Sequence, residues 1–261
     1  MNQEQLLHQL QEIPGKVSFY YKNLVTGEEI SYETQRPLQA ASVIKIPIMA
    51  EAFFQAKEGS ISLQDTYVLK EEDKEPSCGC LNRMQAGLVL KVEDLINLMI
   101  ILSDNSASNI LIRMLGRENI NRRMEQMGYE AIRVNRLLFD FEAAKRGMEN
   151  YVSVKEIADL LGRMYAGTLV DEASSRAMLD ILKAQRLNGK IPFRFLEKID
   201  IAHKTGEDSG ITHDVGIVYG KVPFMVLFMG NEVDVPSFER FMQDTAYELY
   251  EYSGNQCLTK A

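Results

Sequence analysis

The spacing of apolar residues changes along this chain. The first 33 residues show a helical spacing followed by a pattern typical of strands. Residues 2–12 place leucines on one side of a short amphipathic helix, and a Pro-Gly pair at 14–15 ends it. Residues 16–24 are rich in Val, Phe and Tyr, residues 25–28 form a turn, and residues 29–33 run back. The start of the chain therefore predicts a helix followed by a β-hairpin.

From about residue 40 to residue 190 the apolar spacing is helical, and signals for strands are nearly absent. Glycines that end helices follow at Gly116, Gly128 and Gly167, and a capping box at 153–156 opens one helix. The expected helices cover residues 42–56, 92–102, 106–115, 118–127, 153–165 and 171–185. A helical block therefore separates the two ends of the chain.

Strand-like runs return at residues 200–204, 215–219 and 223–229, and residues 238–252 close the chain as a helix. Strands at both ends with a helical block between them predict an α+β fold. We expect one five-stranded antiparallel sheet built from both chain ends and flanked by the terminal helices, with an inserted all-α subdomain.

The same pattern predicts how the chain divides. Residues 1–36 and 195–261 are expected to form an α/β subdomain, and residues 37–194 an all-helical one, within a single compact unit. A substrate site in the cleft between two such halves is the natural expectation.

The composition is that of an ordinary globular protein, with 46% hydrophobic and 25% charged residues. A net charge of −8 argues against nucleic acid or an anionic membrane as the main partner. The three cysteines, Cys78, Cys80 and Cys257, are odd in number and irregularly spaced, which excludes a disulfide framework. No second Cys or His pair completes a zinc site, so we expect no metal and no cofactor.

The chain opens with neither a basic segment nor a strongly apolar one, and no apolar run is long enough to span a membrane. We expect a cytoplasmic protein, unless a leader has been removed, and a monomer whose partner is a small-molecule substrate. There are only three histidines, His8, His203 and His213, so any chemistry must rest largely on other residue types.

Ser42 and Lys45 form an S-x-x-K motif that follows a loop and opens an apolar helix. A serine cap with a solvated lysine is the ordinary interpretation of such a tetrapeptide. Here the two side chains share one helical face, and the neighbours Ile44 and Ile46 imply burial, which lowers a lysine pKa. A neutral lysine can accept the serine proton, and the start of a helix favours the developing alkoxide. The motif therefore predicts a serine nucleophile.

Two further motifs follow Ser42. Ser103-Asp104-Asn105 lies between two expected helices, where capping is the ordinary interpretation, and Lys204-Thr205-Gly206 stands at the end of a strand-like run. S-x-x-K, S-D-N and K-T-G in this order are the signature set of class A β-lactamases and penicillin-binding proteins. The chain resembles a class A β-lactamase-like serine hydrolase, and the resemblance extends through nearly its whole length.

The resemblance implies a role in catalysis for each of the first two motifs. Ser42 would be the nucleophile that becomes acylated, and Lys45 would be its base or part of it. Ser103 would relay a proton to the departing nitrogen. Asn105 would hydrogen-bond a substrate amide and help to fix Lys45.

The third motif is implied to bind the substrate. Lys204 would supply positive potential for a substrate carboxylate, and Thr205 of the Lys204-Thr205-Gly206 strand would donate a hydrogen bond. The backbone N–H groups of Ser42 and Glu207 would hold the oxyanion. The acidic pair Glu207-Asp208 is unusual in this family and would oppose an anionic substrate beside Lys204.

A larger departure concerns removal of the acyl group. Class A enzymes carry a loop glutamate that activates the deacylating water. Aligning this loop on Arg133 and Arg136 puts Leu138 at that position, and a leucine cannot accept a proton. Asp140 and Glu142 could substitute if the loop is remodelled, although a solvated loop carboxylate is the ordinary interpretation of each. Acylation is therefore better supported than fast deacylation.

A histidine-based triad is disfavoured. His213 and Asp214 are neighbours, but adjacent strand residues point to opposite faces, so Asp214 is not expected to orient His213. His203 precedes Lys204 and should face away from it. We expect His213 to be a polar contact for the substrate instead.

Three functions are considered, and the first is the one we predict. The first is a β-lactamase that is acylated at Ser42 and hydrolyses a β-lactam amide. The second is an esterase or D-Ala-peptide hydrolase on the same fold, which Leu138 and the acidic Glu207 favour. The third is a penicillin-binding or sensing protein that deacylates slowly.

Overall fold

The structure is a computed structural model that describes residues 2–76, 78–195 and 199–256. It divides into two compact units. The first unit comprises Met1–Val43, Val152–Leu161 and Leu187–Ala261, and the second comprises Ile44–Tyr151 and Gly162–Arg186. The subdomain limits expected from the sequence, at residues 36 and 195, stay a prediction, and each unit is described by itself below.

The first unit holds the sheet. Its strands are β1 (Lys16–Asn23), β2 (Glu29–Tyr32), β7 (Ile201–Asp208), β8 (Ile211–Val218) and β9 (Phe224–Asn231). They run in the order β2-β1-β9-β8-β7, and every neighbouring pair is antiparallel. Strands from the two chain ends pair directly, with Lys16 opposite Asn231, so the expected five-stranded antiparallel sheet is confirmed.

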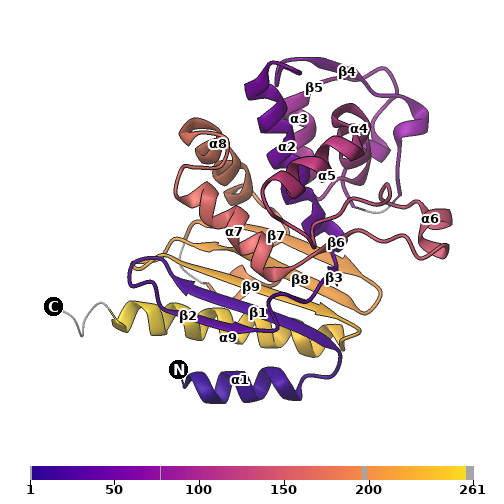
Figure 1. Ribbon diagram of the computed structural model, residues 1–261. Coiled ribbons are helices and arrows are strands. Elements are labelled where there is room, and N and C mark those ends of the chain that lie inside the picture. The colour runs from indigo at the N-terminus through magenta and orange to yellow at the C-terminus, as the bar shows by residue number, and fades with distance from the viewer. Residues whose placement is uncertain (1, 77, 196–198, 257–261) are drawn as a thin grey trace. The chain divides into compact units, whose positions relative to one another are not determined.

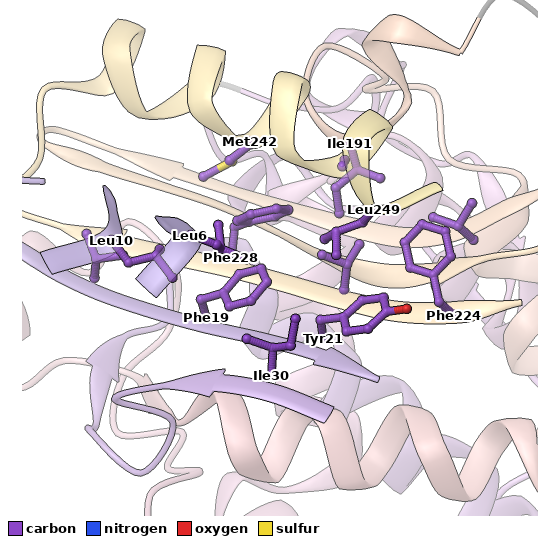
Figure 2. Packing of buried hydrophobic residues seen from close by; sticks show 14 of the residues in the cluster. Leu6, Leu10, Phe19, Tyr21, Ile30, Ile191, Phe224, Phe228, Met242 and Leu249 are labelled. Carbon is purple, nitrogen blue, oxygen red and sulfur yellow. The ribbon is translucent and has the colours of Figure 1, made fainter. Parts of the chain in front are cut away.

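The terminal helices cover one face of this sheet. Helices α1 (Gln3–Glu12) and α9 (Val235–Gln256) lie together on that face (Figure 1). Their apolar residues share one core with the strands, in which the rings of Phe19 and Phe228 lie 5.2 Å apart and Leu10 and Met242 pack nearby (Figure 2). Burial of this apolar surface holds the two ends of the chain in one layer.

The second unit is mainly helical. It contains α2 (Lys45–Glu58), α3 (Val92–Ile101), α4 (Asn105–Leu115), α5 (Arg117–Gln126), α6 (Phe141–Lys145) and α8 (Glu172–Lys183), while α7 (Val154–Tyr165) crosses the limit between the units. These ranges agree closely with the apolar spacing of the sequence, apart from α6, which was not expected. The α+β class with an inserted helical block is confirmed.

Short strands in the middle of the chain were missed. β4 (Thr66–Val68) pairs with β5 (Val89–Lys91), and β3 (Leu38–Gln39) and β6 (Tyr151–Val152) form a second small pair. Segments of two or three residues are too short to show a strand period.

One strand limit was also wrong, because β7 does not end at Lys204. Its backbone continues to pair with β8 as far as Asp208, and the chain turns only at Gly210, whose φ is +67°. A turn at this position favours glycine because other residues rarely adopt a positive φ. The K-T-G motif therefore lies inside a strand.

Candidate active site

Ser42 lies in a single 3₁₀ turn, Ala41–Ile44, that leads directly into α2. Ala41 has a φ of 41°, a left-handed conformation that is strained for a residue other than glycine and is often found at functional sites. Ser42 is half-buried, whereas Val43 and Ile44 are fully buried and anchor the turn. Pro47 is tolerated because the first N–H groups of a helix need no partner within it. The strained turn thus places a serine at the start of a helix, three residues before Lys45.

Lys45 lies at the centre of a polar cluster in the second unit. Its side chain is fully buried, and its Nζ donates to the carbonyl oxygen of Ser103 at 2.7 Å, to Ser103 Oγ at 3.0 Å and to Asn105 Oδ1 at 2.8 Å. These oxygens are uncharged, so the amine is held by dipoles. The contact with Ser103 Oγ joins Lys45 to a hydroxyl that can carry a proton.

Asp104, between the two residues that contact Lys45, bonds backbone N–H groups of α4 and of the preceding loop. Its carboxylate caps α4 by accepting the Ala107 N–H at 2.9 Å, and it also accepts the N–H groups of Cys80 at 2.7 Å and Leu81 at 2.9 Å. The capping interpretation of the S-D-N motif is therefore right for its central residue. Ser103, with a φ of 53°, and Asn105 lie on either side of Asp104 and contact Lys45.

The K-T-G motif lies in β7 of the first unit. Lys204 is fully buried, and its Nζ donates to the Thr205 carbonyl oxygen at 2.9 Å. A Cβ at Gly206 would lie 3.0 Å from the ring of His213 and 3.3 Å from the Ala40 carbonyl oxygen. Only a residue without a side chain fits this close approach without displacing its neighbours.

Glu207 makes an ion pair that the sequence did not reveal. Its carboxylate lies 3.0 Å from the Nζ of Lys190, a nearly buried lysine on the loop before the short helix Ile191–Arg194. No local pattern marks Lys190, since it stands in a polar loop and its partners come from other elements. The acidic charge at Glu207 is therefore paired with a cation.

His213 is completely buried in β8. Its Nε2 lies 2.9 Å from the Gln39 carbonyl oxygen, and its Nδ1 lies within hydrogen-bond distance of the Gly230 N–H, at 3.1 Å. Burial lowers the pKa of this imidazole to about 4, and the nearby Lys190 contributes to the shift. His213 is therefore neutral at neutral pH, and its suggested contact with substrate stays a prediction.

Asp214 orients the other buried histidine. Its Oδ1 lies 2.8 Å from His203 Nδ1, and its Oδ2 accepts the Ile191 N–H at 3.0 Å. This agrees with the expectation that Asp214 does not orient its neighbour His213, because adjacent strand residues face opposite sides.

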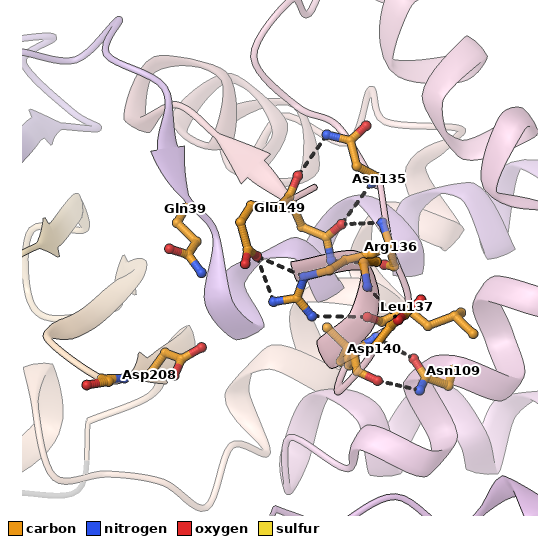
Figure 3. A network of polar contacts seen from close by, with 12 residues as sticks. Gln39, Asn109, Asn135, Arg136, Leu137, Asp140, Glu149 and Asp208 are labelled. Atoms are coloured by element: carbon orange, nitrogen blue, oxygen red, sulfur yellow. Dashed lines mark hydrogen bonds and ion pairs between the residues drawn. The ribbon is translucent and has the colours of Figure 1, made fainter. Parts of the chain in front are cut away.

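The loop before α6 is fixed by amide and charge contacts. Asn109 Oδ1 accepts the Leu138 N–H at 2.8 Å, and Asn109 Nδ2 donates to the Leu138 carbonyl oxygen at 2.9 Å. Arg136 pairs with Glu149 at 2.6 Å, and Asn150 Oδ1 accepts the Arg136 N–H at 3.0 Å (Figure 3). The backbone N–H and carbonyl groups of Leu138 are therefore both bonded to the one side chain of Asn109.

The two loop carboxylates suggested as substitutes for a general base have other partners. Asp140 caps α6 by accepting the Ala143 N–H at 2.9 Å. Glu142 pairs with Lys145 at 2.8 Å, and both side chains are 72% exposed. These contacts are typical of a helix cap and a solvated ion pair. A role for either residue in deacylation stays a prediction.

The described part of the chain gives little support for thiol or metal chemistry in catalysis. Neither Cys78 nor Cys80 forms a disulfide among the described residues, and burial together with Asp104 raises the pKa of Cys80; Cys257 lies outside the described residues. Among residues 2–76, 78–195 and 199–256, no group of three or more His, Cys, Asp and Glu side chains is arranged to hold a metal ion. None of the described helices combines the length and hydropathy needed to cross a bilayer.

A sheet built from both chain ends, an inserted helical block and the three motifs together define the serine β-lactamase and penicillin-binding class. The chain belongs to the Beta-lactamase enzyme family, whose model matches residues 3–253. Membership and fold together support a serine hydrolase.

Comparison with individual proteins places the chain within this family at low identity. It is 24% identical over 204 residues to the beta-lactamase regulatory protein BlaB of Streptomyces cacaoi, a match that covers 70% of this chain and 64% of BlaB. The aligned region thus spans less than two thirds of that relative. The structure is similar to the crystal structure of a beta-lactamase from Sphaerobacter thermophilus, with 27% identity, a TM-score of 0.88 and 97% of each chain covered.

A second solved structure shares the fold. PBP-A matches with a TM-score of 0.87 and 24% identity, over 97% of this chain and 96% of that one. A leucine-to-glutamate variant of PBP-A, solved as an acyl-enzyme complex with penicillin G, matches equally well.

Proposed function

We propose that this chain is a serine hydrolase of the class A β-lactamase type that forms an acyl-enzyme on Ser42 and hydrolyses a β-lactam amide. The observation that carries the proposal is the buried cluster in which Lys45 contacts both Ser103 Oγ and Asn105 Oδ1. A buried amine that contacts a serine hydroxyl, three residues after a second serine in the chain, offers a route for a proton without a histidine or a metal.

The acylation step assigns each proton to a named group. Ser42 Oγ attacks the β-lactam carbonyl carbon while its proton passes to Lys45, and the tetrahedral oxyanion is held by the backbone N–H groups of Ser42 and Glu207. The C–N bond of the lactam then breaks. Ser103 gives its proton to the departing nitrogen and regains one from Lys45.

The remaining motif residues bind the substrate in this proposal. Asn105 hydrogen-bonds the amide of the acyl side chain. Lys204 provides positive potential for the substrate carboxylate, and Thr205 donates a hydrogen bond to it. Gly206 supplies backbone that no side chain obstructs.

Leu138 supports a slow second half-reaction. It offers no group that could activate a water, so the acyl-enzyme is expected to be long-lived, as in a penicillin-binding or sensing protein. A protein that traps penicillin and one that turns it over differ at this single step.

Intact-mass measurement after incubation with penicillin G tests the acylation. The wild type should gain the mass of one penicillin, and Ser42→Ala should gain none. Nitrocefin turnover then measures deacylation, and a persistent adduct with little turnover identifies the slow form. Absence of any adduct would contradict acylation, and turnover of p-nitrophenyl esters alone would select the esterase alternative.

A further inference from the structure

Two cysteines lie in the loop that contacts the S-D-N motif. Cys78 is exposed and Cys80 is half-buried, and only Gly79 stands between them. The chain bends at all three residues. Cα atoms two positions apart reach about 7 Å in a fully extended chain and lie closer together in a bent one. A disulfide bond spans Cα separations of roughly 4.4–6.8 Å, so this bend brings the two residues into its range.

Backbone groups of these cysteines hold the S-D-N motif. The Cys80 N–H donates to Asp104 Oδ2 at 2.7 Å, and the Asn105 N–H donates to the Cys78 carbonyl oxygen at 3.3 Å. Gly79 has a φ of +106°, and a Cβ there would overlap the Asp104 carboxylate. The loop therefore follows the shape of Asp104 closely, and a change in its backbone must disturb these contacts.

The two thiols differ in what can reach them. Burial raises the pKa of the Cys80 thiol, and the Asp104 carboxylate adds to the shift, so Cys80 stays protonated at neutral pH. Cys78 is exposed, so a dissolved oxidant meets its sulfur first. An accessible thiol with a second thiol beside it is typical of sites that form a disulfide reversibly. Closing a ring across one residue adds little stability, because the stabilisation grows with loop length, and this suits a reversible bond.

We propose that Cys78 and Cys80 are an oxidative modification site, at which a hydroperoxide joins the two thiols in a disulfide that loosens the S-D-N motif. Formation of the disulfide is independent of the proposed function. Its effect on acylation rests on that function, because Ser103 and Asn105 are the residues of the motif that contact Lys45. The reactant is a small hydroperoxide, such as hydrogen peroxide.

The reaction proceeds in two balanced steps. The Cys78 sulfur attacks one oxygen of hydrogen peroxide, the O–O bond breaks, and one water leaves with the thiol proton, which gives a sulfenic acid at Cys78. The Cys80 sulfur then attacks the Cys78 sulfur, the S–O bond breaks, and the hydroxyl group leaves with the Cys80 proton as a second water. Two thiols thus lose two electrons and two protons, and one peroxide becomes two waters.

The new bond changes the geometry on which the motif depends. A disulfide requires a torsion angle of about 90° at the S–S bond, so the backbone between the two sulfurs has to turn. The Cys80 N–H then leaves Asp104, and the Asn105 N–H leaves Cys78, which loosens the start of α4. Ser103 and Asn105 lose their fixed positions beside Lys45, and a displacement of about 1 Å in such groups can slow a reaction about 100-fold. The oxidised protein is therefore expected to be acylated slowly.

The first test detects the bond itself. Trypsin releases residues 75–83 as one peptide that contains both thiols and no methionine, so oxidation of methionine does not disturb its mass. After brief treatment of the purified protein with hydrogen peroxide, this peptide should be about 2 Da lighter than its reduced form, and dithiothreitol should reverse the loss. Cys257→Ser should behave like the wild type, whereas Cys78→Ser and Cys80→Ser should show no such loss.

The second test follows the consequence for the motif. In the oxidised protein, hydrogen exchange at the Cys80 and Asn105 amides should accelerate. Acylation by penicillin G, measured by intact mass after the peroxide is removed, should slow about tenfold. Dithiothreitol should restore both rates. Cys78→Ser, treated in the same way, is the matched control and should keep its exchange and acylation rates, because it cannot form the bond.

Each outcome bears on a separate claim. An unchanged peptide mass in the wild type, or a loss that requires Cys257, would overturn the modification site. A disulfide that leaves both hydrogen exchange and acylation unchanged would overturn its link to the S-D-N motif. Failure of the reduced wild type to be acylated would overturn the proposed function, whereas the peptide mass and the hydrogen exchange would still decide this inference.

Discussion

In the proposed reaction, the side chain at Leu138 decides whether the acyl group is removed quickly. Its backbone N–H and carbonyl groups both bond Asn109, so a different side chain can be placed there without moving the loop. The S-x-x-K and S-D-N residues proposed to serve acylation lie outside this loop. We therefore expect acylation and deacylation to be separable by substitution at one position.

We expect Leu138→Glu to shorten the lifetime of the penicillin acyl-enzyme by about 100-fold, because a positioned general base contributes at least that factor. The lifetime is measured by following the loss of the adduct by intact mass after excess penicillin is removed. Leu138→Gln has a similar size but no basic group, and it should leave the lifetime within a few-fold of the wild type. Equal lifetimes in all three proteins would show that another group limits deacylation.

Ion pairs between residues far apart in the chain could not be predicted from the sequence. Glu207 was recognised as an unusual acidic residue, but its partner Lys190 could not be found from the sequence. A lysine in a polar loop carries the same local pattern whether it is solvated or buried. Only the packing of that loop against β7 and β8 makes Lys190 a buried cation.

At the scale of elements, the start of α4 links a structural cap to the candidate site. Asp104 is buried and accepts three backbone N–H groups, from Ala107 in α4 and from Cys80 and Leu81 in the preceding loop. The negative charge of the carboxylate also interacts favourably with the positive end of the α4 helix dipole. One side chain therefore fixes both the helix start and the loop beside it.

We expect Asp104→Asn to lower the free energy of unfolding by about 2 kcal/mol, since hydrogen bonds to a charged group each contribute more than neutral ones. Urea unfolding measures this loss. Asp234 accepts the Ser237 N–H near the start of α9 but is exposed, so Asp234→Asn should cost less than about 1 kcal/mol. Hydrogen exchange at the Cys80 and Leu81 amides should also accelerate in Asp104→Asn alone. Equal losses in both variants would contradict the role of burial at Asp104.

At the scale of the whole molecule, His213 makes stability depend on pH. The folded protein holds this imidazole neutral, with a pKa of about 4, because it is buried. The unfolded chain has the ordinary histidine pKa of about 6.5, so between these values it binds more protons than the folded protein. The contribution of His213 to the free energy of unfolding is therefore fully present above about pH 6.5, and it is lost as the pH falls toward 4.

We expect this group to remove about 2 kcal/mol of unfolding free energy between pH 7.5 and pH 5. Urea unfolding of the wild type and of His213→Gln at both pH values isolates the contribution. The variant should be less stable than the wild type at pH 7.5, because the contacts with Gln39 and Gly230 are altered, but its stability should fall less on acidification. Parallel losses in the two proteins would assign the pH dependence to other groups.

Much of the fold could be predicted because it is encoded locally. The helical period between residues 42 and 185 and the β-rich chain ends specify most elements, and the spacing of the three motifs indicates the class of site. The extent of β7 could not be read locally, because its last residues are strand only through pairing with β8. The short pair of β4 and β5 was missed because three residues are too few to show a strand period.

The sequence by itself determined the α+β class, the pairing of both chain ends in one sheet, and the motifs from which we propose a serine-lysine chemistry that needs no histidine. These features follow from residue periodicity and from motifs a few residues long. Only the tertiary structure decided that Lys190 faces Glu207 and that His213 is neutral and bonded to Gln39, 174 residues away in the chain. Charge state and partner choice depend on burial, and burial is a property of the folded molecule that no local pattern contains.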